Sequence, residues 1–486
     1  MKTGPLPRER LAIHFALSRA FDHKGLQSQF ISYSVALAFK SFLAKMTPLM
    51  CEILRAWTSL EHSQWYENPK LVKLRENKLS RIVEHAYRTV PFYRRLYEEL
   101  GVDPGKVKRL SDLAKLPLVT RKRLQEAGIE ARTAIGTDLN ACMVQSTSGT
   151  SGMRLHFYED QTSGVWSDAL NLRLLWAYGY RPFQRLCRTR VNDPSGRVPK
   201  PKISDVGLWG FVRRHGMKQI LYNTEPAEAV LALADWRPDI IFGNPAYLRL
   251  LAKYAKTNGV KVKCKTIITA GQLLDNSTRD FIGKTFQAEV YDHYGLEEVG
   301  GSVAWECPTH YGYHVNDECL ILEFLRDGRT VASGEEGEIY ITSLTRTVAP
   351  IIRYATGDIG VPLDHDCKCG RGLSLLKNIQ GRIMDYVITQ DGKWVPSISI
   401  ISAIEEIQGI EQYKVFQNED QTIQVFVMIS NGMESQVFGE ARQVCLDLFG
   451  DTPVRVFKVD RVEHASGTKF RIVESALTKS PVEEHE

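Results

Sequence analysis

The chain has 486 residues, of which 43% are hydrophobic and 24% are charged, which is typical of a globular protein with room for one large and one smaller domain. Its formal net charge of +5 is small and spread along the chain, which argues against a dedicated nucleic-acid-binding protein. Nine cysteines are too few for a disulfide scaffold and no signal peptide is recognisable, so we expect a reducing, cytoplasmic location.

The first part of the chain, residues 1–66, is expected to be a helical extension because residues 9–66 hold few glycines or prolines. No apolar run approaches the ~20 residues of a membrane span. Tyr33–Met46 is apolar but contains Lys40 and Lys45, which favours a helix packed on the body of the protein over a helix on a membrane surface. Three roles stay open for the extension: covering the body, forming a homodimer or touching a membrane.

A second helical segment follows at about residue 77. Leu79, Ile82, Val83 and Ala86 recur at helical spacing, and Pro91 interrupts the pattern because proline lacks the amide hydrogen that a helix interior needs.

Between about residues 140 and 360, short β-rich runs alternate with helical stretches. The expected strands include Asp239–Gly243, Lys265–Gly271, Ala288–Gly295 and Gly337–Leu344. This alternation predicts βαβ units and a parallel sheet. Such sheets bind ligands at the carboxyl ends of their strands.

The last part of the chain has a finer pattern. A helix near Ser399–Ile407, a hairpin within 412–429, a helix near Met433–Leu448 and a strand at 454–459 predict a separate small domain of about 100 residues. The expected fold class is therefore α/β, with a large domain at residues 67–383 that contains βαβ subdomains and a small C-terminal α/β domain at residues 384–486.

Ser146–Gly152, with the sequence STSGTSG, is expected to be a loop because hydroxyl residues and glycine compete with helices and pack poorly in strands. Its backbone amides and hydroxyls are the groups that surround phosphate oxygens. The run is not a Walker A loop, which needs GxxxxGK followed by Ser or Thr. Taken alone, a phosphate loop and a flexible surface loop stay equally open.

Three further segments carry candidate ligands for a nucleotide. Tyr294–Gly301 (YGLEEVGG) follows an expected strand, where a carboxylate can hold Mg²⁺ against phosphate oxygens or simply begin a helix. Arg353–Gly360 (RYATGDIG) places Asp358 in a turn, either to accept hydrogen bonds from ribose hydroxyls or only to form the turn. Gly467–Val473 (GTKFRIV) carries Lys469, which is equally compatible with a solvated basic side chain.

The order of these segments is more specific than any one of them. STSGTSG, YGLEE, YATGD, QGRIMD and GTKFR follow one another in an order that resembles the adenylate-forming superfamily of acyl-CoA synthetases and adenylation domains. KLSRIVEHAYRTVPFYRRLYEELGV and CKCGRG resemble its phenylacetate–CoA ligase-like branch, which includes members associated with capsular polysaccharide biosynthesis. The resemblance covers roughly residues 70–475.

The resemblance implies a two-step reaction. The oxygen of a small-molecule carboxylic acid attacks the α-phosphorus of ATP and releases pyrophosphate. The small domain, mobile in this family, then rotates, and a thiol such as that of CoA attacks the acyl-adenylate. Transfer to an amine or a sugar is the first alternative, and a homologue that binds nucleotide without catalysis is the second.

By position, the resemblance also assigns roles to residues. Glu298 would hold Mg²⁺, and Lys469 would bridge the carboxylate and the α-phosphate, stabilising charge in the transition state. Ser146–Gly152 would wrap the triphosphate, and Tyr294 would stack on adenine opposite the turn Ala270–Gln272. Asp358 and Arg382 would contact the ribose hydroxyls. The nucleotide-binding residues would be Ser146, Thr147, Ser148, Gly149, Thr150, Ser151, Gly152, Arg154, Gly271, Gln272, Tyr294, Gly295, Asp358 and Arg382.

The chain departs from the family pattern at three places. The phosphate loop usually ends Gly-Lys, but Met153 follows Gly152 here, so the cation would come from Arg154. Met384 stands where a hinge residue is usual, and Glu297 replaces the threonine of the family's YGxTE motif.

Two cysteine-containing segments, AWECPTHYGYH and DHDCKCGRG, supply candidate zinc ligands. Their Cys₃His composition suits a tetrahedral structural site, although Cys-x-Cys is tighter than the usual CxxC and the spacing alone is equally compatible with unrelated thiols. The branch resemblance favours zinc. The ligands would be Cys307, His310, Cys367 and Cys369, with His314 as the alternative histidine because it begins an expected strand.

His293 precedes the tyrosine of the YGLEE motif. Two interpretations stay open for it: a residue that lines the acyl pocket, and an ordinary strand histidine.

Overall fold

The computed structural model describes residues 48–146, 155–181, 184–190, 216–382 except 223, and 386–477 with gaps at 393, 397–399, 402, 405, 431, 461 and 463–471. The extension before residue 48 therefore lies outside the described residues. Within the described residues, no helix combines the length and the hydropathy that crossing a membrane requires.

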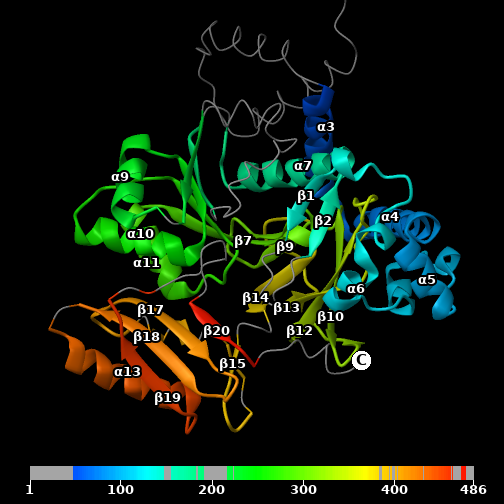
Figure 1. The fold of residues 1–486 in the computed structure, drawn as a ribbon. Coiled ribbons are helices and arrows are strands. Elements are labelled where there is room, and N and C mark those ends of the chain that lie inside the picture. The colour runs from blue at the N-terminus through cyan, green and yellow to red at the C-terminus, as the bar shows by residue number, and fades with distance from the viewer. Residues whose placement is uncertain are drawn as a thin grey trace, which may run out of the picture.

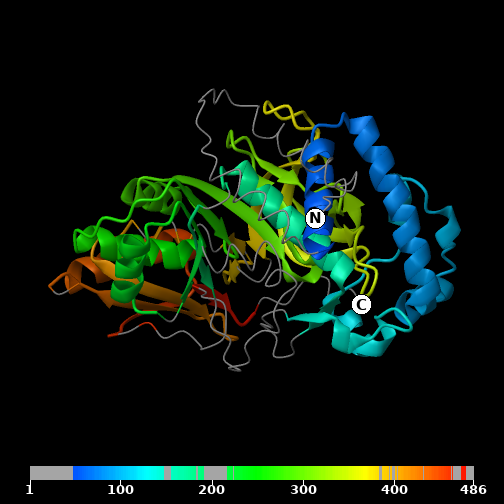
Figure 2. The same ribbon diagram turned by 90° about the horizontal axis from the view of Figure 1, so that it is seen from above.

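The described chain begins with helices that pack at one end of the molecule, drawn in blue and cyan in Figures 1 and 2. The expected helical pattern is confirmed: Leu79, Ile82, Val83 and Ala86 are buried on one helix, and Pro91 begins the next. The elements are α3 (Pro48–Ser63), α4 (Asn68–Thr89), α5 (Pro91–Glu99) and α6 (Arg121–Ala131), with short 3-10 turns at η1 (Pro104–Lys106), η2 (Leu110–Lys115) and η3 (Leu139–Ala141).

Helix α3 packs against α7 (Gln161–Ala177), and the rings of Trp57 and Trp176 meet edge to face with centroids 5.1 Å apart. The last helix of the expected extension therefore shares a hydrophobic core with the large domain.

In the described part of the chain, twelve strands form one mixed sheet in the order β11-β10-β12-β13-β14-β9-β8-β7-β6-β5-β3-β4. The half from β4 to β7 is parallel, which confirms the expected βαβ units. Its elements are β3 (Leu186–Arg190), β4 (Met217–Leu221), α9 (Pro226–Trp236), β5 (Ile240–Gly243), α10 (Pro245–Thr257), β6 (Thr266–Ala270), α11 (Asn276–Phe286) and β7 (Glu289–Leu296).

The other half of the sheet is antiparallel, beginning where β7 pairs with β8. The turn η5 (Glu297–Val299) joins those two strands. The remaining strands are β8 (Gly301–Glu306), β9 (Tyr313–Val315), β10 (Leu320–Arg326), β11 (Arg329–Thr330), β12 (Gly337–Ser343), β13 (Tyr354–Leu363) and β14 (Leu375–Arg382), and a separate hairpin joins β1 (Met143–Ser146) to β2 (His156–Glu159).

Alternating side chains of the parallel strands face two different helical layers. Cys187, Ile241 and Ile267 pack with α9, α10 and α11, whereas Ile240 and Ile268 pack with residues of α7 on the opposite face. The continuously apolar strands follow from this burial on both faces.

The C-terminal part forms a smaller α/β unit, drawn in orange and red in Figure 1. Its four-stranded sheet has the order β19-β18-β17-β20. Lys253 Nζ of α10 donates to the carbonyl of Ile410 at 2.6 Å, which ties this unit to the large domain. The elements are β15 (Tyr386–Ile388), β16 (Trp394–Pro396), β17 (Ile410–Gln417), β18 (Ile423–Ile429), α13 (Glu434–Phe449), β19 (Val454–Lys458) and β20 (Val473–Ser475). The expected α/β fold class is confirmed, and the domain boundary near residue 384 lies outside the described residues.

Candidate active site

The carboxyl ends of β6 and β7 bring two of the expected nucleotide segments together. Ala270, the last residue of β6, pairs with His293 of β7, so the turn of Gly271 and Gln272 lies beside the strand that carries Tyr294. Gly271 has a φ of +85°, a conformation that glycine adopts without strain. Parallel pairing therefore places the AGQ turn next to the tyrosine, as a site at a strand's carboxyl end requires.

Tyr294 and Asp358 meet although 64 residues separate them in the sequence. The hydroxyl of Tyr294 donates to Asp358 Oδ2 at 2.5 Å, and the aspartate is only 4% exposed. Asp358 lies on β13, opposite Arg382 of β14 in the antiparallel register. The backbone thus brings the two residues expected at the ribose side by side, while the side chain of Arg382 lies outside the description.

Gly295 lies where the chain leaves no room for a side chain. A Cβ at this position would stand 2.9 Å from the carbonyl oxygen of Gly301 and 3.1 Å from Cε1 of His293. Any larger residue would push β7 away from β8 just beside Tyr294. The glycine of the YG motif is therefore required by the close approach of these strands.

Glu298 lies in η5, directly after β7, and is 4% exposed. The hairpin strand β1, which ends at Ser146, contacts the same turn. The start of the expected phosphate loop thus lies beside the expected magnesium ligand. The loop residues Thr147, Ser148, Gly149, Thr150, Ser151, Gly152 and Arg154, the side chain of Ser146 and the whole of Lys469 lie outside the described residues.

Arg346, which the sequence interpretation missed, is buried close to this turn. Its Nη2 donates to the carbonyl of Tyr158 at 2.8 Å, and its Nη1 lies 3.5 Å from Glu159 Oε1. Burial lowers the pKa of Arg346, and the carboxylates of Glu159, Asp160, Glu297 and Glu298 oppose that shift. The positive charge of the Arg346 guanidinium therefore compensates part of the negative charge of these four carboxylates. The available signal was an arginine two residues after the expected strand at 337–344.

Three cysteines and one histidine form a compact cluster at the other end of β8. One ligand atom from each residue lies within 4.8 Å of the others. The sulfur atoms of Cys307 and Cys367 are 3.6 Å apart, and Nε2 of His314 lies 3.2 Å from the sulfur of Cys369. Three thiols and one imidazole are the donor set of a closed tetrahedral zinc site.

The electrostatics of the cluster favour thiolate at two of its cysteines. Burial alone would raise the pKa of Cys369, but hydrogen bonds from His314 and Arg371 lower it to about 5. The pKa of Cys307 is also lowered, because hydrogen bonds from His314 and Thr309 outweigh its burial. Burial raises the pKa of Cys367 to about 12.

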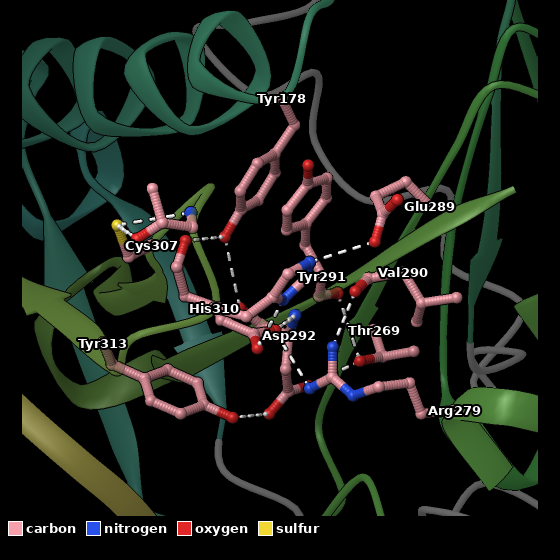
Figure 3. Close-up of polar contacts among 12 residues, drawn as sticks. Tyr178, Thr269, Arg279, Glu289, Val290, Tyr291, Asp292, Cys307, His310 and Tyr313 are labelled. Carbon is pink, nitrogen blue, oxygen red and sulfur yellow. Dashed lines mark hydrogen bonds and ion pairs between the residues drawn. The ribbon is translucent and has the colours of Figure 1, made fainter. Parts of the chain in front are cut away.

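The structure reverses the order of the two candidate histidines. His310, the first choice, is not among the clustered residues: its Nδ1 lies 3.0 Å from Glu306 Oε1 and its Nε2 lies 3.0 Å from Glu289 Oε1. Figure 3 shows its ring against that of Tyr291, with the centroids 5.0 Å apart. Both ring nitrogens are thus engaged by carboxylates, and His314 of β9 faces the cysteines instead.

The polar groups around Asp292 form a network that is almost entirely paired, also visible in Figure 3. Asp292 accepts from the hydroxyls of Thr269 at 2.5 Å and Tyr313 at 2.9 Å. Glu306 accepts from the backbone of Asp292 at 2.7 Å and from Arg279 at 3.0 Å. The network links Glu306, the last residue of β8 before Cys307, to Asp292 of β7, the strand that carries Tyr294.

The chain is similar in sequence to known ligases. No protein-family model matches the chain. The phenylacetate–coenzyme A ligase of Thermus thermophilus is 26% identical over 365 residues, which cover 73% of this chain and 80% of that protein. The phenylacetate–coenzyme A ligase of Escherichia coli strain K12 is 26% identical over 363 residues, which cover 70% of this chain and 77% of that protein.

Among solved structures, 2-hydroxyisobutyryl-CoA ligase in the postadenylation state with 2-HIB-AMP gives a TM-score of 0.70 at 21% identity, covering 85% of this chain and 90% of that one. The same ligase in the thioesterification state, with 2-HIB-AMP and CoA, gives 0.57 at 21% identity, covering 84% and 90%. The fold is therefore shared with this ligase.

Proposed function

Because the chain is a phenylacetate–CoA ligase-like member of the adenylate-forming superfamily, we propose that it activates a carboxylic acid with ATP and passes the acyl group to the thiol of coenzyme A. The observation that supports this most directly is the meeting of Tyr294, Asp358 and the Glu298 turn at the carboxyl edge of the parallel sheet. Tyr294 and Glu298 belong to one motif and Asp358 to another, 64 residues from Tyr294 in the sequence, yet they converge where such sheets bind ligands.

In the first step, a carboxylate oxygen forms a bond to the α-phosphorus while the bond from that phosphorus to pyrophosphate breaks. Asp358 accepts hydrogen bonds from ribose hydroxyls, and Tyr294 stacks on adenine beside the turn of Gly271 and Gln272. Lys469 stabilises the charge that develops between the carboxylate and the phosphate. A carboxylate needs this activation because oxide is a very poor leaving group, whereas AMP leaves readily.

Magnesium fits the acidic turn, because a carboxylate oxygen is the ligand this ion prefers beside phosphates. Glu298 would hold it, and the ion would neutralise phosphate charge. Arg346, close to the same carboxylates, keeps the turn from accumulating uncompensated negative charge.

In the second step, the thiolate of CoA attacks the acyl carbon, a thioester forms and AMP leaves. Both phenylacetate–CoA ligase relatives are named for CoA, which favours a thiol over an amine or a sugar as the acceptor. Transfer to an amine or a sugar is the alternative, and an assay that varies the acyl acceptor distinguishes it from transfer to CoA.

We further propose a structural zinc ion held by Cys307, His314, Cys367 and Cys369. Four side-chain donors leave no open position for a substrate, so the metal would fix the two loops that carry the cysteines rather than take part in the reaction.

The experiment that tests the reaction is ATP–pyrophosphate exchange with a panel of carboxylic acids, followed by acceptor assays with CoA and with amines. Exchange that depends on one class of acid, with AMP release that depends on CoA, supports the proposal. ATP binding without exchange for any acid would instead identify a non-catalytic homologue.

Lys469→Ala is the decisive variant for that assay. It should lower exchange by at least about 100-fold while largely sparing ATP affinity, because its contact matters most in the transition state. Unchanged exchange in this variant would remove Lys469 from the mechanism.

A further inference from the structure

The face of the parallel sheet that packs against α7 changes character along its strands. Before the carboxyl ends of the strands, this face carries the buried apolar side chains of Leu186, Ile240 and Ile268. Toward the carboxyl ends, the same face carries Arg188 on β3 and His293 on β7. Arg188 and His293 thus lie on this face at the edge where the proposed reaction takes place.

Arg188 is the most unusual of these residues. It pairs with Phe242 in the parallel register, and its guanidinium carbon lies 5.1 Å from the centre of the Phe242 ring. The structure places no hydrogen bond and no ion pair on its guanidinium among the described residues. A guanidinium carries five N–H donors, and no residue of the described part of the chain accepts from any of these five.

Protein atoms surround Arg188, but its side chain is still exposed to solvent. Burial lowers its pKa, and the carboxylate of Glu297, the residue that replaces the family's threonine, opposes that shift. The guanidinium remains protonated because its ordinary pKa is far above neutrality. Arg188 is therefore a positive charge held among protein atoms at the end of an apolar face.

Arg190, two residues along the same strand, provides a contrast. Its Nη1 donates to Gln219 Oε1 on the neighbouring strand at 3.4 Å. Arg190, nearer the end of β3, is thus hydrogen-bonded to a neighbouring strand, whereas Arg188 makes no hydrogen bond to any described residue.

His293 faces Arg188 across the Phe242 ring, whose centroid lies 5.9 Å from that of the imidazole. Its Nε2 lies 3.0 Å from the hydroxyl oxygen of Ser302, and that oxygen accepts from Asn316 Nδ2 at 2.9 Å. Ser302 can then donate its own hydrogen to Nε2, which leaves the imidazole hydrogen on Nδ1. That Nδ1 is buried and has no partner in the described structure.

We propose that Arg188 and His293 form an anion-binding subsite at the far end of the acyl site, so that the enzyme activates acids that carry a second carboxylate. This inference rests on the proposed adenylation reaction and names the class of its substrate. The planar fork of a guanidinium matches a carboxylate in two parallel hydrogen bonds, and the imidazole N–H supplies a further donor. Phe242 contributes an apolar wall for the carbon chain between the two carboxylates.

A singly charged carboxylate suits this subsite better than a phosphate ester. Glu297 places a negative charge near Arg188, and its repulsion grows with the charge of the ligand. A phosphate ester carries up to two charges at neutral pH. The geometry therefore favours diacids over phosphorylated acids.

The test is ATP–pyrophosphate exchange with matched pairs of acids on the full chain. Succinate, glutarate and adipate are compared with butyrate, pentanoate and hexanoate, and 4-carboxyphenylacetate with 4-methylphenylacetate. We expect kcat/KM to be at least about 10-fold higher for the diacid in the best pair, the scale of a charge-assisted hydrogen-bonded contact.

Three variants locate the effect. Arg188→Gln should remove the preference, lowering the ratio of diacid to monoacid by about 10- to 100-fold, and Arg188→Lys should retain part of it because the charge remains. Arg190→Gln, from the same strand, should leave the ratio unchanged. Equal melting temperatures of Arg188→Lys and the wild type exclude a folding defect as the cause.

Two outcomes overturn the subsite: a wild-type preference for the monoacid in every pair, or a ratio that Arg188→Gln does not change. If no acid of either class supports exchange, the adenylation proposal fails by itself. Calorimetric titration of glutarate and adipate into the wild type and Arg188→Gln then decides the subsite, since binding that depends on Arg188 supports it and its absence removes it.

Discussion

Asp292 and His293 are consecutive residues of β7, and their side chains point to opposite faces of the sheet. On one face, the carboxylate of Asp292 accepts two hydroxyl hydrogen bonds, and the nearby Glu306 is paired with Arg279. On the other face, one imidazole nitrogen of His293 has no partner in the described structure, and Arg188 has no ion pair there. One strand thus carries a completed polar network on one side and unused donors on the other.

The difference separates stability from binding. A buried charge whose partners are all present holds elements together, and removing one partner leaves the other charge uncompensated. A donor without a partner stabilises nothing in the free protein, and its position at a strand's carboxyl end suits a ligand. The variants below test each side of β7 against the other.

The largest effect is expected from replacing the two arginines in the same way. Arg279→Leu should lower the free energy of unfolding by about 3 kcal/mol, because Glu306, with a side chain only 7% exposed, would lose its ion-pair partner. Arg188→Leu should change it by less than about 0.5 kcal/mol. Urea unfolding followed by tryptophan fluorescence measures both. Equal losses would mean that Arg188 is as structural as Arg279.

The two histidines near the cysteine cluster give the next comparison. His314→Gln should lower the zinc content from about one equivalent per chain to well below half, because a closed site needs all four ligands. His310→Gln should retain the metal, since its ring nitrogens contact Glu306 and Glu289. Elemental analysis after dialysis measures the content, and Cys367→Ser serves as a second ligand variant. Loss of metal in His310→Gln alone would restore the original choice of ligand.

The two faces of β7 should also respond to pH in opposite directions. Burial raises the pKa of Asp292 from 3.8 to about 6, so the folded chain keeps a proton that the unfolded chain releases, and this contribution to stability falls as pH rises through that window. Burial and the charge of Arg188 lower the pKa of His293 from 6.5 to about 3, so its contribution rises as pH rises from 3 to 6.5.

Asp292→Asn and His293→Gln separate these two contributions. Relative to the wild type, the stability of Asp292→Asn should increase between pH 4 and 6 by up to about 1.4 kcal/mol per pH unit, and that of His293→Gln should decrease by a similar slope. Chemical denaturation across this pH range measures both differences. Slopes of the same sign would contradict the assignment of the two residues to opposite environments.

Sequence reasoning reached the parallel half of the sheet because its strands are apolar on both faces and alternate with helices. The family resemblance implied that Tyr294 and Asp358 would lie near the same nucleotide, but not that their side chains would be hydrogen-bonded to each other. Of the antiparallel strands, the one at 337–344 and the one that begins at His314 were expected. The pairing of β8 to β14 was missed, because it joins segments that lie far apart in the sequence.

The choice of histidine failed for a local reason. His310 lies in a turn with φ of +55°, which directs its ring to Glu306 and Glu289. His314 pairs with Leu375 of β14, so the strand that was taken as an argument against it brings it beside the loop of Cys369. The spacing of residues along the sequence does not reveal that His314 pairs with Leu375 across the two strands.

Arg188 was missed because a single charged residue within a short strand usually faces solvent. Its significance depends on what lies around it, and the sequence does not show that Phe242 and His293 come from two other strands of the same face. Only the paired rows of the sheet reveal the arrangement.

The smallest effect is expected where the two halves of the sheet meet at the nucleotide. Tyr294→Phe keeps the ring that would stack on adenine and removes the hydroxyl that donates to Asp358. The buried carboxylate would lose a fixed partner and, with it, its orientation toward the ribose. One such hydrogen bond contributes about 1 kcal/mol, so KM for ATP should rise about fivefold with little change in kcat.

Tyr291→Phe is the matched control, because Tyr291 lies three residues before Tyr294 on the same strand and its ring is stacked between those of Tyr178 and His310. Its removal of a hydroxyl should leave KM for ATP unchanged. A lower KM in Tyr294→Phe would mean that the tyrosine competes with the ribose for Asp358 rather than orienting it. The hydrogen bond would then belong only to the ligand-free state, and the carboxylate would act without help from its neighbour.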